Sequence, residues 1–144
     1  MKLGIDMIVL VKATVLSVGL NGKNKALKQL PVRVVNMRTG LEASRSLKNE
    51  KFDSIISNWE LPDMKDGLFL KGLRRIKPDI PTIAVVKAGS TRQEISARSI
   101  GVSAVLTSDT TDEIFRQTVA EILGLRSADS IMEISAVADE IEER

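Results

Sequence analysis

The chain reads FDSIISNWELPDMKDG at residues 52–67, where a short apolar run gives way to a polar turn that contains proline. Comparable apolar runs occur on either side of it, at residues 13–18, 32–37, 81–86 and 102–106. Between these runs lie segments with helical spacing or helix-capping signals, at residues 23–30, 40–50, 68–76, 90–100 and 110–123. Short apolar strands that alternate with amphipathic helices form a parallel sheet, because right-handed crossovers place helices on both of its faces. The sequence therefore predicts an α/β protein, a single doubly wound (βα)5 domain with a five-stranded parallel sheet.

Capping residues mark the ends of the last two predicted helices. Ser90 with Gln93 forms a capping box at the start of the fourth helix, and Thr110 with Glu113 repeats this pattern for the fifth. Gly101 fits the carboxyl-terminal cap of the fourth helix, because glycine tolerates the left-handed backbone found there.

The pattern divides the chain into an N-terminal extension at 1–11, the domain at 12–125, and an acidic amphipathic helical tail or linker at 126–144. The tail has a third capping box at Ser130 and Glu133. Apolar residues follow in the tail at helical spacing, namely Ile131, Ile134, Val137 or Ala138, and Ile141. This predicts a helix with an apolar face to bury. Three interpretations stay open: the helix packs on its own domain or frays, forms a homodimer seam, or leads to an output domain.

The composition removes several classes of chemistry. The chain has 144 residues, enough for one buried core, and it contains no cysteine and no histidine. Disulfides, thiolate nucleophiles, Cys/His metal sites and Ser-His-Asp triads are therefore excluded. Carboxylate sites for hard cations and the chemistry of Lys, Asp, Glu or Ser side chains remain.

Charge is distributed unevenly along the chain. Residues 127–144 carry six acidic side chains and one basic side chain, a net charge of −5, and the 20 basic and 13 acidic side chains of residues 1–126 give +7. With only one Trp and three Phe, the chain has no evident platform for stacking bases, and we do not expect nucleic acid as a partner. The apolar run Met7–Val11 is too short to span a membrane. We therefore expect a cytoplasmic protein that does not bind membranes.

Three segments carry a family resemblance when taken together. Residues 58–67 (NWELPDMKDG) match the pattern D-x-x-M-P-x-M-D-G with one residue inserted before Asp66. Residues 81–90 (PTIAVVKAGS) match a fourth strand and its following loop, and residues 97–109 (ARSIGVSAVLTSD) match A-x-x-x-G-A-x-x-Y-L-x-K-P. In this order the segments resemble the receiver (CheY-like) domains of bacterial response regulators. The resemblance implies a flavodoxin-like fold and a role in two-component phosphorelay signalling.

The resemblance also assigns residues to the positions that perform phosphoryl transfer. Asn58 stands at the phosphoacceptor aspartate, Gly19 and Leu20 at the acidic pair that holds magnesium, Val86 at the Ser/Thr, Ser108 at the lysine, and Val105 at the switch aromatic. The amide of Asn58 cannot form an acyl phosphate, and a hard cation needs oxygen ligands that Gly19 and Leu20 lack. We therefore expect an apolar, inactive site without enzymatic activity, cofactor or metal, and a domain that stays in one conformation.

The leading hypothesis is a pseudo-receiver, a non-enzymatic protein-interaction module that acts without phosphorylation. The resemblance implies that a signalling protein or output domain docks on the face bounded by residues 90–100 and 110–123. One alternative is an atypical regulator that accepts phosphate on Asp63 or Asp66, although carboxylates in this turn commonly cap the next helix. Another is a flavodoxin-like domain that binds a small ligand at the strand ends. Lys87 is expected to be a solvated loop residue.

Overall fold

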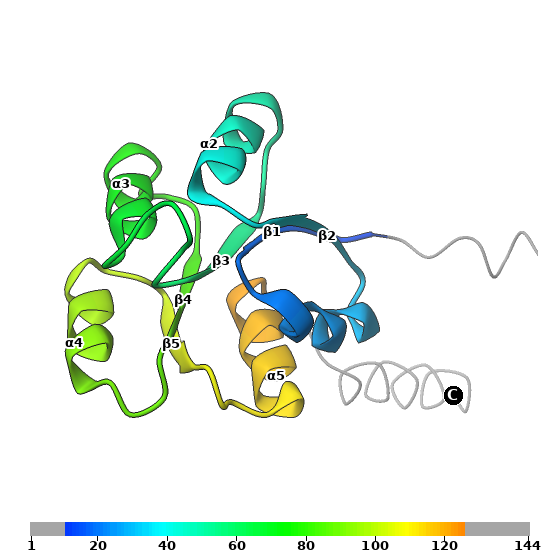
Figure 1. The fold of residues 1–144 in the computed structure, drawn as a ribbon. Coiled ribbons are helices and arrows are strands. Elements are labelled where there is room, and N and C mark those ends of the chain that lie inside the picture. The colour runs from blue at the N-terminus through cyan, green and yellow to red at the C-terminus, as the bar shows by residue number, and fades with distance from the viewer. Residues whose placement is uncertain (1–10, 126–144) are drawn as a thin grey trace, which may run out of the picture.

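Five parallel strands form one sheet in the computed structural model, which describes residues 11–125 (Figure 1). The strands lie in the order β2-β1-β3-β4-β5. They are β1 Ala13–Val18, β2 Val32–Met37, β3 Ser54–Asn58, β4 Thr82–Val86 and β5 Ala104–Thr107. The helices are η1 Asn21–Gln29, which is a 3-10 helix, and α2 Gly40–Asn49, α3 Leu68–Ile76, α4 Thr91–Ser99 and α5 Asp112–Ile122. The predicted doubly wound (βα)5 fold is confirmed.

Helices cover both faces of the sheet. In Figure 1, η1 and α5 lie on one side of the strands, and α2, α3 and α4 lie on the other. Successive side chains of a strand point to opposite faces. Val15 therefore packs in the core cluster of η1 and α5, whereas Leu16 packs in the cluster of α2, α3 and α4. Both faces are buried, which is why the central strands read as continuous apolar runs.

The bounds of β1 and β2 match the predicted runs, and those of β3, β4 and β5 differ from the predicted runs by one or two residues. β3 begins at Ser54 rather than at Phe52, because the ladder with β1 starts with the pair Val15 and Ser54. Its other end includes Asn58, which pairs with Val85 of β4. Pairing between strands, rather than the apolar run itself, sets where each strand begins and ends.

The two predicted helix caps have different outcomes. Ser90 caps α4 as predicted, with its hydroxyl accepting a 3.2 Å hydrogen bond from the backbone N–H of Gln93. The cap predicted at Thr110 is wrong by one residue, since Thr111 accepts from the N–H three residues further on at 3.3 Å. Thr110 instead accepts a 3.1 Å hydrogen bond from the N–H of Thr107, which closes the turn after β5.

The two ends of the chain lie largely outside this description. The predicted extension at 1–11, except for Val11, and the predicted tail at 126–144 are outside the described residues. Among the helices that are described, none has both the length and the apolar character needed to cross a membrane.

Candidate functional site

The carboxyl ends of the strands surround a pocket of about 450 Å³. Parallel strands end at the same edge of a sheet, and ligands of doubly wound folds bind at that edge. The pocket is lined by Leu20, Asn21, Gly22, Lys23, Asn58, Val85, Ser108 and Asp112. The fold therefore brings together three of the predicted site residues, namely Leu20, Asn58 and Ser108.

Asn58 lies at the end of β3 and is tied to the turn after β1. Its side-chain Nδ2 donates a hydrogen bond to the carbonyl oxygen of Gly19. Gly19 has φ +68°, and a Cβ at this position would lie 2.6 Å from Cδ2 of Leu61. This turn requires glycine, because any side chain there would meet both a strained backbone and a buried neighbour. The amide donor of Asn58 is thus engaged by the backbone.

The charged groups of the pocket differ from the acidic pair that the resemblance implies for a magnesium site. Asp112 is the single carboxylate among the lining residues, and Leu20 is a buried part of the core beneath η1. Lys23 donates a 2.6 Å hydrogen bond from Nζ to the carbonyl oxygen of Thr110, which joins η1 to the loop before α5. Within residues 11–125 there is no group of three Asp, Glu, His or Cys side chains that could hold a metal. Mg²⁺ is usually held by one or two carboxylates together with phosphate oxygens and water, and Gly19 and Leu20 provide no carboxylate at the expected place.

Val86 and Val105 do not line the pocket, so the expectation that they make it apolar does not hold. Val86 is 2% exposed and packs in the core on the side of α2, α3 and α4. Val105 is half-buried against the same cluster. The cause is the alternation of strand side chains, which aims Val85 toward the pocket and Val86 toward the opposite face of the sheet.

Ser108 holds two neighbouring loops together. Its N–H donates to the carbonyl oxygen of Val86 at 2.8 Å, which extends the pairing of β4 with β5. Its Oγ accepts a 3.1 Å hydrogen bond from the N–H of Ala88 in the loop before α4. Ser108, which the resemblance assigns to the lysine position, is therefore a bridge between loops.

A second bridge passes through Glu60 and Gln93, which the sequence did not reveal. One carboxylate oxygen of Glu60 accepts from the N–H of Asp66 at 2.9 Å, and the other accepts from Nε2 of Gln93 at 3.4 Å. The side-chain oxygen of Gln93 in turn accepts a 2.8 Å hydrogen bond from the N–H of Lys87. Gln93 is buried, although in the sequence it is recognisable only as the partner of Ser90 in a capping box. The chain of contacts connects the β3–α3 loop, α4 and the β4–α4 loop.

Asp63 and Asp66 both have partners within the fold. The prediction that they cap the next helix, α3, is wrong. The carboxylate of Asp63 accepts from the N–H groups of Gly40 and Leu41 at 2.9 and 3.0 Å, so it caps the preceding helix α2. The hydrogen bond from Gly40 is the main reason why the pKa of Asp63 lies below its usual value. The first residue of α3 instead follows Gly67, which has no side chain to cap it.

Asp66 forms ion pairs with two cations. Its carboxylate lies 3.3 Å from the guanidinium of Arg92 and 3.7 Å from Nζ of Lys71. The positive charge of Lys71 is the largest cause of the lowered pKa of Asp66. Lys87 has an exposed side chain and is not part of the pocket lining, as expected of a loop lysine.

Comparison of the sequence with known proteins finds a family model and similar relatives. Residues 18–136 match the family model of the response regulator receiver domain. The chemotaxis protein CheY homolog of Campylobacter jejuni is 28% identical over 103 residues, which cover 69% of this chain and 79% of that relative.

Solved structures share the fold at lower sequence identity. A CheY-like receiver domain protein from Methanospirillum hungatei has a TM-score of 0.70 and 19% identity, covering 78% of this chain and 94% of that chain. The receiver domain of the sensor histidine kinase PA1611 from Pseudomonas aeruginosa, described with a magnesium ion coordinated in its active-site cleft, has a TM-score of 0.67 and 19% identity over 78% of this chain and 98% of that one. Since the family model spans most of the sequence, this chain belongs to the response regulator receiver domain family, the signalling modules of two-component systems.

Proposed function

We propose that this receiver domain works as a phosphorylation-independent interaction module, a pseudo-receiver. The observation that carries the proposal is the state of the acceptor position: β3 ends in Asn58, and the amide of Asn58 is hydrogen-bonded to the backbone of Gly19. Phosphoryl transfer to a carboxylate needs a nucleophilic oxygen, a cation to neutralise charge, and groups that hold the transferred oxygens. At the positions assigned by the resemblance to the nucleophile and the metal ligands, the chain has Asn58, Gly19 and Leu20, which supports the proposal.

The ion pairs and hydrogen bonds around the site support a single conformation. Asp63 is engaged by the start of α2, and Asp66 is engaged by Arg92 and Lys71, so neither carboxylate is a free nucleophile. A ligand shifts a conformational equilibrium only through its differential affinity for the two states. Without a phosphoryl group to bind, the bridges through Ser108 and Gln93 hold the loops in one arrangement.

The partner that we propose is a signalling protein or an output domain. The docking face lies on α4, β5 and α5, where each helix exposes one isoleucine: Ile95 is 62% exposed and Ile114 is 50% exposed. Exposed apolar side chains ringed by polar groups are typical anchors of protein interfaces. Ile95 and Ile114 are therefore the residues that we propose as apolar contacts for the partner.

The experiment treats the full chain with a small phosphodonor and magnesium, and records its intact mass and its amide NMR spectrum. We expect no added phosphoryl group and no shifts in residues 82–112. The chain with Asn58→Asp is the first comparison, and it should also stay unmodified because the acidic pair and the lysine are still missing. Chains with Asp63→Ala or Asp66→Ala are the second comparison. Phosphate incorporation that either of these two changes abolishes would replace the proposal with an atypical phosphoacceptor.

A further inference from the structure

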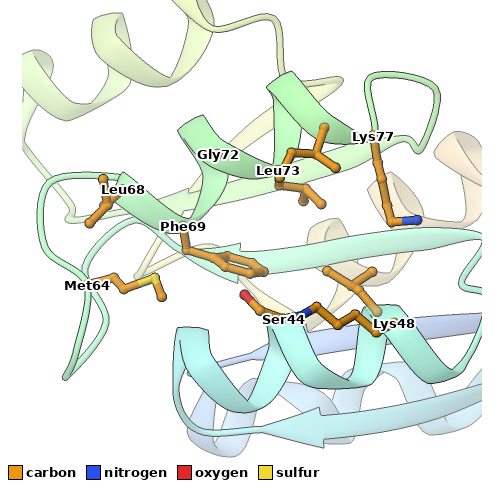
Figure 2. Close-up of a pocket in the computed structure, with 10 residues that line it drawn as sticks. Ser44, Lys48, Met64, Leu68, Phe69, Gly72, Leu73 and Lys77 are labelled. Carbon is orange, nitrogen blue, oxygen red and sulfur yellow. The ribbon is translucent and has the colours of Figure 1, made fainter.

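A groove separate from the strand-end pocket runs between α2 and α3. It has a volume of about 660 Å³. The apolar residues that line it are Leu47, Met64, Leu68, Phe69, Leu73 and Ile76. Figure 2 shows Ser44 of α2 and Phe69 of α3 facing each other across it, with Met64 toward one end and Lys48 and Lys77 toward the other. The groove is open along its length and apolar in its lining.

The rim of this groove exposes apolar side chains that the fold does not need. Leu68 is 58% exposed and Ile76 is 77% exposed, although both belong to the apolar pattern of α3. The floor is also open, since a Cβ added at Gly72 would meet nothing within 4 Å. α3 therefore buries Phe69 and Leu73 and leaves a second apolar edge outside. Contiguous exposed apolar surface of this kind marks a binding site more often than chance.

The charges around the groove are basic. Lys48 and Lys77 both line it, both are exposed, and within residues 11–125 neither forms an ion pair. An apolar groove with unpaired cations fits an amphipathic helix that carries acidic residues beside its apolar stripe.

The chain itself contains a segment with this chemistry. Apolar residues recur at helical spacing at Ile131, Ile134, Val137 or Ala138, and Ile141, and residues 127–144 carry a net charge of −5. These residues follow α5, which lies on the opposite face of the sheet from the groove (Figure 1). The distance from α5 to the groove, across the sheet and the helix layers on its two faces, is roughly 20 Å in a straight line. The path around the edge of the sheet is longer. The link between Leu125 and Ile131 spans at most about 20 Å when fully extended. Residues 131–141 are therefore too closely tethered to α5 to reach the groove of the same chain around the sheet.

We propose that the α2–α3 groove binds residues 131–141 of a second copy of this chain. Exchange of the two tails is reciprocal, so each copy fills the groove of the other in a two-fold symmetric dimer. This dimer goes beyond the proposed function and does not depend on it, because no residue of the strand-end pocket lies in the groove.

The first test measures self-association of the full chain by sedimentation velocity over a range of concentrations. The groove variant carries Leu68→Glu and Ile76→Glu, and the tail variant carries Ile134→Glu and Ile141→Glu. A control variant with Val11→Glu makes the same kind of change at an exposed apolar position that belongs neither to the groove nor to the proposed docking face. We expect a dimer that the groove and tail variants each weaken about tenfold or more, as for central interface residues, and that the control leaves unchanged. A monomeric parent chain, or a dimer that only the control or only the tail variant weakens, would overturn the proposal.

The second test identifies which copy fills the groove. The chain contains no cysteine, so Ser135→Cys provides a single site for a nitroxide label. Spin-labelled chains are mixed with ¹⁵N-labelled chains that carry no nitroxide. We expect broadening of amide signals along α2 and α3 of the ¹⁵N-labelled copy, and loss of this broadening with the Lys48→Glu and Lys77→Glu changes. Broadening that appears only when both labels are on one chain would mean docking within the chain and would overturn the exchange.

Discussion

The two glycines that bracket the start of α3 provide a sharp test of the fold at the β3–α3 loop. Gly67 precedes α3 with φ +72°, and a Cβ there would overlap the ring of Trp59. Trp59 is 1% exposed, so its ring has no free space into which to move. Gly72 lies inside α3, and a Cβ there would meet nothing within 4 Å. The same substitution, Gly to Ala, should therefore have opposite effects at the two positions.

The magnitudes follow from these environments. At Gly67 a side chain in the left-handed region costs about 1–2 kcal/mol. Crowding against a well-packed core side chain costs a further ~1–3 kcal/mol. Gly67→Ala should thus lower the free energy of unfolding by about 2–5 kcal/mol. Gly72→Ala should raise it by about 0.5–1 kcal/mol, because alanine loses less backbone entropy in a helix.

Urea denaturation, followed by circular dichroism, measures both effects on one scale. The midpoint and the slope are fitted together, since a constant slope shows that only stability has changed. A Gly67→Ala chain as stable as the parent would refute the assigned loop geometry. A destabilised Gly72→Ala chain would show that the space above α3 is filled, and would argue against an open groove.

Three further predictions concern the site. Asn58→Asp should lower the free energy of unfolding by about 1–3 kcal/mol, because it replaces the donor to the Gly19 carbonyl with a negative oxygen, and denaturation at pH 7 measures the loss. Asp63→Asn should reduce stability at pH 7, and the reduction should shrink as the pH falls below about 3.9: the pKa of Asp63 is lowered in the folded state, so its contribution is present above the unfolded pKa of about 3.9 and disappears as the pH falls through the folded value. Gln93→Glu should lower the free energy of unfolding by about 1–3 kcal/mol and speed amide hydrogen exchange at Lys87, because it places a second carboxylate beside Glu60.

Matched variants separate these effects from a general loss of stability. Asp79→Asn and Gln117→Glu make the same chemical changes at exposed positions away from the site, and they should leave the denaturation midpoint almost unchanged. If Asp79→Asn alters the pH dependence as much as Asp63→Asn, the assignment of that dependence to the α2 cap fails. If exchange at Lys87 is the same with and without Gln93→Glu, the bridge does not hold the β4–α4 loop.

Under the proposed function, the receiver fold is kept and the strand-end residues serve structural contacts. The positions that would need charge now hold groups with local structural partners: Asn58 bonds to the turn after β1, and Ser108 bonds to the loop before α4. The core beneath them depends on apolar strand residues such as Leu16 and Ile55, which are fully buried. The stability of the sheet and the chemistry at its edge therefore rest on different residues.

The sequence by itself determined the class of fold and the family. Apolar runs such as 13–18 and 81–86 encode buried strands because both faces of a parallel sheet are covered, and this information is local and periodic. The asparagine at residue 58, on which the proposed function depends, is likewise visible in the sequence. Local capping chemistry identified Ser90 correctly and missed Thr111 by one residue, since both threonines suit a cap and the turn after β5 decides between them.

Only the tertiary structure decided how the strand-end residues are used. Contacts such as Asp63 with α2, Glu60 with Gln93, and Ser108 with Ala88 join residues that lie 20 to 33 positions apart. Such pairs leave no periodic signal, because they depend on where the sheet places the ends of separate loops. The groove between α2 and α3 is hidden in the sequence for the same reason: the pattern shows that Leu68 and Ile76 are apolar, and packing alone decides that they remain exposed.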